Sequence, residues 1–269
     1  MIHTAEFFIH VNIAFIRNLE NLYRGKNINL IFAEIENLYP GIRIWSAPVK
    51  FRHAIFKINL FVDFIKLLGR KDSIIDEDDY EEIEAKLNEV CQKIEIRHID
   101  LLTLSRLDYR FDAVINNDAV RSFLVKRYKK LFDHYRFKEK NDLYDTTIYF
   151  NSKSLRTVCY DKEEERKKRP YEQNDYEKNV LRFEVSLSTK TFYNNWKRKN
   201  LNRTLKNYLT KEQYWYYMER NVVDLFGIGD FYKCYQAKKI IEGSDEPDNM
   251  KKKLEIFLNN ISKKGLEKV

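Results

Sequence analysis

Apolar and polar residues alternate along several segments of the chain, and strict alternation is typical of half-buried β-strands. Residues 1–13 show this pattern, with Ala5, Phe7, Ile9 and Val11 on one side. Alternation and a high density of strand-forming residues predict further strands at about 42–46, 50–61, 103–114 and 181–187. Each strand would present one set of side chains to a core and the other set to solvent.

Apolar residues at three- and four-residue spacing predict helices between these strands. The predicted helices span about 14–24, 28–39, 80–94, 117–138 and 190–209. The charged stretch 163–179 is expected to be a connector. Residues 211–269 also have a helical pattern, which a polar break at 243–248 interrupts. Because helices follow strands in both halves, we predict an α+β fold. It would be a pseudo-duplicated, mainly antiparallel twisted sheet with helices packed on one face and a C-terminal helical segment.

The predicted domain organisation follows the same outline. We expect one domain over residues 1–209, made of two α+β halves at about 1–98 and 99–209, and a basic helical segment at 210–269. A chain of 269 residues is long enough to bury a sizeable core.

Cysteine usage and hydropathy indicate the compartment. The three cysteines, Cys91, Cys159 and Cys234, are odd in number and widely spaced, so we expect neither a disulfide framework nor a zinc site. No apolar run is long enough to span a bilayer, and the first residues lack the pattern of a signal peptide. We therefore predict a cytoplasmic protein that does not enter a membrane.

The chain has a formal net charge of +8, and the basic residues are concentrated after position 121. Aromatic residues are interleaved with them, notably at 214–217. A basic surface with stacking side chains favours a nucleic-acid partner. A solvated lysine-rich surface, with the aromatic cluster in a helix core, would give the same composition, so the composition leaves both interpretations open.

A hairpin is predicted at the centre of the chain, where Thr147–Phe150 and Leu155–Tyr160 flank a polar break at 151–154. Alternation places Arg156 and Tyr160 on one face of the second strand. It places Cys159 on the other face, and we expect this cysteine in the core behind Tyr160.

Two other predicted strands carry charges on one face. One face of 103–114 would present Arg106, Asp108, Arg110 and Asp112, and one face of 181–187 would present Arg182, Glu184 and Ser186. A single polar face is routine in an antiparallel sheet, where acids and arginines can simply pair across strands. Three such strands together with a tyrosine would gather carboxylates suited to a cation and arginines suited to a phosphate.

These residue types have a specific chemistry in common. A tyrosine hydroxyl can attack a phosphodiester and hold the DNA as a phosphotyrosine. A divalent cation on carboxylates can polarise the phosphate and stabilise the leaving oxygen. Arginine and lysine can neutralise the charge on the non-bridging oxygens.

Four motifs in order resemble a known family: LSRLDYRF (104–111), TIYFNSKS (147–154), VCYDKEEER (158–166) and LRFEVSL (181–187). They are similar to those of the rolling-circle replication initiators of small Gram-positive plasmids, the Rep_trans type. The resemblance covers about residues 99–209. Asn151 stands where the family's turn often has glycine. As in that family, the His-hydrophobic-His motif of other initiators is missing, and His98-Ile99-Asp100 is the nearest approach.

The resemblance implies Tyr160 as the nicking nucleophile and Asp108 and Glu184 as ligands of Mg²⁺ or Mn²⁺. It implies that Lys162 and Arg182 serve the phosphate. From its position on the same face we add Asp112 as a third metal ligand. Rival nucleophiles are Tyr149, Tyr171 and Tyr176. The predicted DNA-binding residues are Arg106, Arg110, Arg156, Lys197, Arg198, Lys199 and Arg203.

The expected function is a nicking–closing enzyme that starts rolling-circle replication at a double-stranded origin with a single-stranded nick site. The resemblance also implies a homodimer and a host helicase of the PcrA type. We expect origin specificity in the basic residues from Lys197 onward. Two alternatives stay open: a non-enzymatic sequence-specific DNA-binding regulator, and a metal-dependent nuclease that uses water as the nucleophile.

Overall fold

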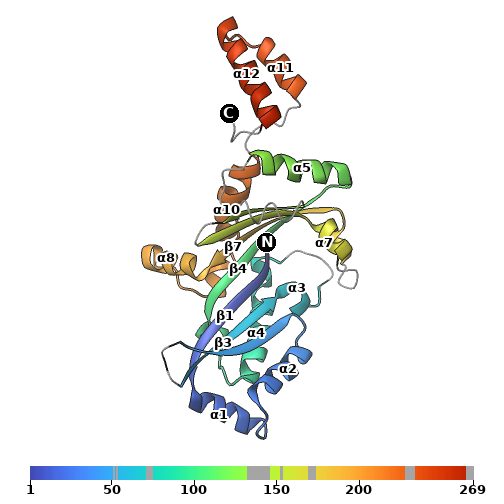
Figure 1. Ribbon diagram of the computed structural model, residues 1–269. Helices are drawn as coiled ribbons and strands as arrows, with labels where there is room; N and C mark the ends of the chain where they lie inside the picture. Colours follow the sequence, from blue (N-terminus) through green and yellow to red (C-terminus); the bar gives the residue numbers. More distant parts are fainter. Residues whose placement is uncertain are drawn as a thin grey trace.

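The computed structural model describes residues 1–50, 52, 54–70, 75–131, 146–151, 154–168, 174–227 and 234–264. These residues form an α+β fold around one seven-stranded sheet (Figure 1). The predicted fold class is therefore confirmed. Of the rival nucleophiles, Tyr171 lies outside the described residues.

The sheet has the strand order β2-β3-β1-β4-β7-β6-β5, and every neighbouring pair is antiparallel. The strands are β1 (Ile2–Asn12), β2 (Ile42–Pro48), β3 (Ile55–Asp63), β4 (Thr103–Val114), β5 (Thr147–Asn151), β6 (Leu155–Asp161) and β7 (Val180–Ser188). The first strand of each half, β1 or β4, lies at the centre and pairs with the last strand of its own half. The predicted duplication therefore appears as two outlines that meet along the β1–β4 pair.

The α-helices are α1 (Ile13–Leu22), α2 (Ile28–Leu38), α3 (Phe64–Leu67), α4 (Tyr80–Lys93), α5 (Asp118–Leu131), α7 (Lys162–Lys168), α8 (Thr189–Lys199), α9 (Leu205–Tyr208), α10 (Lys211–Met218), α11 (Cys234–Glu242) and α12 (Asp248–Lys264). Short 3₁₀ turns are η1 (Glu77–Asp79), η2 (Ile99–Leu101) and η3 (Asp175–Glu177), and a π-helical turn is η4 (Glu219–Gly227). None of these described helices is long and apolar enough to cross a bilayer.

Two sequence predictions of secondary structure need correction. The single helix predicted at 190–209 is wrong, because α8 stops at Lys199 and Asn200 adopts a left-handed cap with φ +52°. The charged stretch after β6, expected to be a connector, forms α7 instead. Ion pairs three residues apart, such as Lys162–Glu165 and Arg166–Glu163, stabilise that helix.

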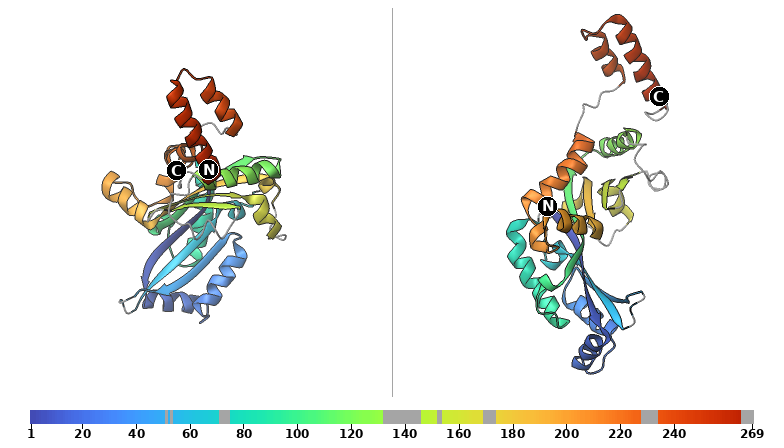
Figure 2. Two further views of the ribbon diagram at one scale, coloured as in Figure 1. Left: turned by 45° about the horizontal axis from the view of Figure 1, so that its top comes forward. Right: turned by 90° about the vertical axis from the view of Figure 1, so that its left-hand side faces the viewer.

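One face of the sheet is apolar and carries most of the helices. Phe7, Leu60, Leu107 and Val185 point to this side and belong to one core cluster that runs through both halves. The side view in Figure 2 shows α4 and α10 together on one side of the strands. Cys159 lies in this core and is 0% exposed, as the alternation predicted.

The aromatic residues of α10 point to different sides of the helix, some to the core and one to solvent. Tyr214 and Tyr217 are buried in the core against Tyr109, which stacks on Tyr217 with ring centroids 5.8 Å apart. Trp215 is exposed. Further along the chain, α11 and α12 pack against each other as a hairpin at the C-terminal end (Figure 1). The boundaries predicted for the two domains stay a prediction.

The opposite face of the sheet is polar and is covered only in part. The turn η3 contributes Glu177, which pairs with Arg182, and Tyr176, whose ring lies 6.0 Å from the guanidinium of Arg110. Charged groups under this turn are therefore buried, whereas the polar face of β1, β2 and β3 keeps exposed side chains, such as Trp45.

Candidate active site

The pairing of β6 with β7 brings Tyr160 to Glu184. Tyr160 lies opposite Arg182, and Glu184 is the next residue of β7 on the same face. The Tyr160 hydroxyl donates a hydrogen bond to Oε1 of Glu184 at 2.9 Å. The ring is half-buried, so the hydroxyl lies on the polar face of the sheet and outside the apolar core. Two residues 24 positions apart in the sequence thus share one contact.

Asp108 lies on the neighbouring strand and on the same face. The register of β4 with β7 sets Asp108 opposite Ser186, diagonal to Glu184. Burial raises the pKa of Glu184, and the negative charge of Asp108 raises it further. The charge of Arg182 and the hydrogen bond from Tyr160 oppose this rise. Two mutually repelling carboxylates on adjacent strands are a donor set that suits a divalent cation.

Asp108 is held firmly on both of its oxygens. Arg106 donates from Nε to Oδ1 at 3.0 Å, and its Nη2 lies 2.7 Å from Oδ2. The hydroxyl of Thr4, from β1, also donates to Oδ2. Asp108 is only 2% exposed, so these partners balance a buried charge. Arg106 also pairs with Glu6 at 3.1 Å.

Asp112, the added candidate for a metal ligand, forms a different contact. Arg182 donates to its two oxygens from Nε at 2.8 Å and from Nη2 at 2.9 Å, and Nε of Arg110 lies 3.5 Å from Oδ2. Arg182 is 0% exposed and also pairs with Glu177. The role of Asp112 at a metal stays a prediction, and in this structure both of its oxygens accept from a buried guanidinium.

Lys162 and Arg182, the two residues predicted to neutralise the phosphate, are each paired with acids in the structure. Nζ of Lys162 lies 2.8 Å from Glu165 and 3.3 Å from Glu177. Arg182 stands across the β-ladder from Tyr160, and its charge lowers the pKa of the phenol. Arg182 therefore contributes positive charge beside the phenol, while both cations contact acids.

The phenol itself is neutral at physiological pH. Burial raises the pKa of Tyr160 well above 10, and the adjacent charge of Glu184 adds to the rise. An attacking phenolate therefore needs a proton acceptor, and Glu184 is already in hydrogen-bond contact with the hydroxyl. The rival Tyr149 lies opposite Val158 on the edge strand β5, and Tyr176 lies over Arg110.

His3 joins this cluster and was not predicted from the sequence. Its Nδ1 lies 4.0 Å from Oε1 of Glu184, because an irregularity between Ile2 and Thr4 shifts the β1 register there. Burial and the charges of Arg110 and Arg182 lower the pKa of His3 well below 6.5, so the imidazole is neutral. Strict alternation would put His3 on the apolar side with Ala5 and Phe7, so the sequence pattern gave no signal for its position beside Glu184.

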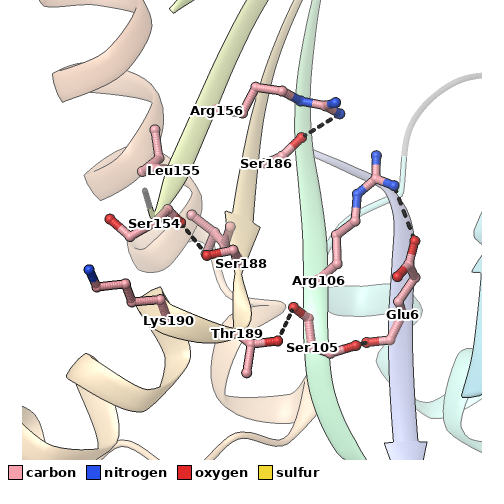
Figure 3. Close-up of a pocket in the computed structure, with 11 residues that line it drawn as sticks. Glu6, Ser105, Arg106, Ser154, Leu155, Arg156, Ser186, Ser188, Thr189 and Lys190 are labelled. Carbon is pink, nitrogen blue, oxygen red and sulfur yellow. Dashed lines mark hydrogen bonds and ion pairs between the residues drawn. The ribbon is translucent and has the colours of Figure 1, made fainter. Parts of the chain in front are cut away.

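A polar groove runs along the sheet beside this cluster (Figure 3). It has a volume of about 430 Å³, and its cationic lining residues are Arg106, Arg156 and Lys190. Nη2 of Arg156 donates to the Ser186 hydroxyl at 3.2 Å. The other predicted DNA-binding residues are placed differently: Arg110 is buried, and Lys197, Arg198 and Lys199 form the exposed last turn of α8. Arg203 is partly buried just beyond this helix.

A separate group of possible metal ligands lies on the helical side. This group consists of Glu84, His98 and Asp100, whose possible ligand atoms lie within 4.8 Å of one another. It is the one such group of three or more His, Cys, Asp or Glu side chains among the described residues. Glu84 belongs to α4, which packs Ile83 and Leu87 into the core. This group is therefore across the sheet from Tyr160 and does not serve its hydroxyl.

One comparison with known proteins identifies a family. The model of the Phage_CRI family, described as the N-terminal part of a replication-associated protein, matches residues 67–209. The match covers more than half of the chain and includes β4 to β7, which carry Asp108, Tyr160 and Glu184. Strands β1, β2 and β3 precede it. No curated protein matches the chain.

Proposed function

The chain belongs to the Phage_CRI family of replication-associated proteins, a family of rolling-circle replication initiators, and we propose that it nicks and rejoins one DNA strand with Tyr160 as the nucleophile. One observation carries the proposal: the Tyr160 hydroxyl contacts Glu184 at 2.9 Å on a face that also carries Asp108. The Rep_trans type is the finer assignment that the four motifs favour, and it is part of this proposal.

The chemical step follows from the contact between the phenol and the carboxylate. The Tyr160 oxygen attacks the scissile phosphorus while its proton passes to Glu184. A bond forms between the phenolic oxygen and phosphorus, and the bond between phosphorus and the 3′-oxygen breaks. The proton returns from Glu184 to the departing oxygen, which leaves a free 3′-hydroxyl. The 5′-phosphotyrosyl ester conserves the energy of the broken phosphodiester bond, so attack by the 3′-hydroxyl on this ester can rejoin the strand.

Asp108 and Glu184 are the residues that would hold a divalent cation, Mg²⁺ or Mn²⁺. The raised pKa of Glu184, caused by burial and then by the charge of Asp108, supports this fit, because a cation between the two would relieve their repulsion. Such a cation would polarise the scissile phosphate and stabilise the charge on the leaving oxygen.

The cations around the phenol have two proposed roles. Arg182 supplies positive charge next to Tyr160, and we propose that it and Lys162, two residues further along the chain, favour the phenolate and the pentacoordinate phosphate. Arg106 and Arg156 line the groove beside the site, where they would bind the backbone phosphates of the strand being cut.

The proposed partners follow from the family and from the charge. They are double-stranded origin DNA, the single-stranded nick site, a second copy of the chain and a host helicase of the PcrA type. The exposed basic turn of α8, Lys197–Lys199, supports a contact with the DNA backbone. Exchange of the chain from Lys197 onward between relatives should transfer origin choice.

A covalent-adduct assay tests the nucleophile. The protein is incubated with a single-stranded origin oligonucleotide and Mn²⁺, and a protein–DNA adduct is expected on a denaturing gel. Tyr160→Phe should abolish the adduct and leave duplex binding within a few-fold. Tyr149→Phe, on the neighbouring strand, is the matched control and should keep the adduct. An adduct that persists in Tyr160→Phe removes this residue from the role.

A second candidate is a DNA-binding regulator without catalysis. The pairs Arg106–Asp108 and Arg182–Asp112 favour it, because each acid already has an arginine partner. This function predicts origin binding with neither cleavage nor adduct. Cleavage without an adduct, unchanged in Tyr160→Phe, would instead identify a nuclease that activates water.

A further inference from the structure

The polar face continues from the candidate active site onto three strands that precede the family match. There it carries aromatic and basic side chains in addition to the acids Glu6 and Asp63. We define the aromatic platform as six aromatic and basic residues of β1, β2 and β3 on this face: Phe8, His10, Arg43, Trp45, Lys57 and Phe61.

Strand register sets these residues side by side. Trp45 lies opposite Asn59, which in turn lies opposite Phe8, so the two rings flank one small amide side chain across three strands. In the next row of the same face Arg43 lies opposite Phe61. Neighbouring strands are about 4.8 Å apart, so each row spans roughly 10 Å, which is enough for adjacent bases.

The three rings are not part of the hydrophobic core. Phe8, Trp45 and Phe61 are absent from the described core cluster and from the apolar residues packed against it, and Trp45 is 42% exposed. Phe8 and Phe61 are half-buried, so Trp45 is the most exposed of the three rings, and exposed apolar patches often mark interaction sites. Their presence in one patch indicates a binding surface.

Cations lie directly over two of the rings. The guanidinium of Arg43 is 4.2 Å from the ring centre of Phe61, and Nζ of Lys57 is 4.4 Å from that of Phe8. Nucleic-acid bases would stack on these rings once the two cations turn from the ring faces to bind the phosphates between the bases. The bases of a duplex are already stacked and paired, so a single strand fits this combination better.

The platform is continuous with the groove beside Tyr160. Glu6 lies opposite Phe61 on β1 and pairs with Arg106, which lines the groove. From β6 to β3 the face crosses four strand spacings, roughly 20 Å. A strand held in the groove can therefore extend onto the platform without leaving the sheet.

We propose that the aromatic platform binds the bases of single-stranded DNA that extends from the nick site. The proposal rests on the proposed function for its assignment of DNA as the partner. Its residues lie outside the matched positions 67–209, so it concerns a surface that the family match does not cover.

Tryptophan fluorescence tests the platform directly, because the chain has three tryptophans. The variant Trp196→Phe/Trp215→Phe leaves Trp45 as the single reporter. Titration with an oligothymidylate of about 20 nucleotides should quench the fluorescence of Trp45. In parallel, the fluorescence anisotropy of a labelled oligonucleotide measures binding, and both signals should saturate at the same concentration. The same sequence annealed to its complement should quench markedly less.

Affinity measurements give a second readout. Trp45→Ala and Phe8→Ala should each weaken oligothymidylate binding by about tenfold. Lys57→Ala should reduce the salt dependence of binding, with a slope smaller by about 0.7 for the one lost phosphate contact. Trp215→Ala, at the exposed tryptophan of α10, is the matched control and should bind like the wild type.

Each outcome separates the two proposals. Oligonucleotide binding without quenching of Trp45, equal quenching by duplex, or no binding at all overturns the platform, whatever the adduct assay shows. Stacking on the platform together with failure of the Tyr160 adduct overturns the proposed chemistry and leaves the platform in place.

Discussion

The buried pair of Arg182 and Asp112 provides the sharpest test of how the site is built. Arg182 is 0% exposed and donates two hydrogen bonds to Asp112, at 2.8 and 2.9 Å. Asp112→Ala would leave the guanidinium buried with Glu177, 3.1 Å from Nη1, as its remaining acidic partner. Loss of one partner of a buried ion pair costs about 3–5 kcal/mol, and because the contact with Glu177 remains, we expect a loss of about 3 kcal/mol.

Thermal unfolding measures this loss. For a domain of this size, about 3 kcal/mol corresponds to a decrease of Tm by roughly 6–12 °C. Asp78→Ala is a control for the removal of an exposed carboxylate, since its side chain is 83% exposed, and we expect a change within about 0.5 kcal/mol. The double variant Asp112→Leu/Arg182→Met should recover most of the lost stability, because apolar residues of similar size often replace a buried ion pair without cost.

The result also separates two roles for Asp112. A metal ligand without a structural role would lower adduct formation and leave Tm unchanged. If Asp112→Ala unfolds within about 2 °C of the wild type, or if the double variant is less stable than the single variant, the buried pair does not stabilise the fold.

Three other groups give predictions of their own. The pKa of His3 is lowered below its unfolded value of 6.5, so the stability that the neutral imidazole contributes is present above pH 6.5 and is lost as the pH falls below it. In the wild type this loss is at most about 1.4 kcal/mol of unfolding free energy per pH unit. His3→Gln should remove this pH dependence, which urea titrations between about pH 5 and 7 would measure. Gly41→Ala should lower the unfolding free energy in urea by more than about 1 kcal/mol, because Gly41 has φ +85° and an added Cβ would meet a carbonyl oxygen at 2.6 Å. Gly25→Ala is the control, because a Cβ there would have no atom within 4 Å, and it should cost less; equal losses would contradict the argument. Glu84→Ala should keep Mn²⁺-dependent adduct formation and Glu184→Gln should remove it, and the reverse result would move the catalytic cation to the helical side of the sheet.

The local part of the site was accessible to sequence reasoning. Alternation assigned Tyr160 and Glu184 to polar faces and Cys159 to the core, and the structure confirms these positions. The four motifs then identified the strands that carry Asp108, Tyr160 and Glu184 as parts of one site. The reason is that a two-residue period, once a strand is recognised, decides which side each residue takes.

Contacts between distant segments were not accessible. Nothing in the sequence indicated that β1 would lie beside β4, so His3 and Thr4 were missed as neighbours of the acids. The stretch 163–179 was expected to be a connector, and the position of η3 over Arg110 and Arg182 explains why these cations are buried and do not face solvent. Such coverage depends on tertiary packing, which residue spacing does not report.

The central position of β1 has a consequence during synthesis on the ribosome. This strand is made before the other six strands of the sheet, and one of its edges stays open until β4, which begins at Thr103, leaves the exit tunnel. An unpaired central strand rich in phenylalanine and isoleucine is a template for pairing with other chains. The nascent first half therefore depends on the second half to close its sheet, and pauses in translation before residue 114 should increase aggregation more than pauses after it.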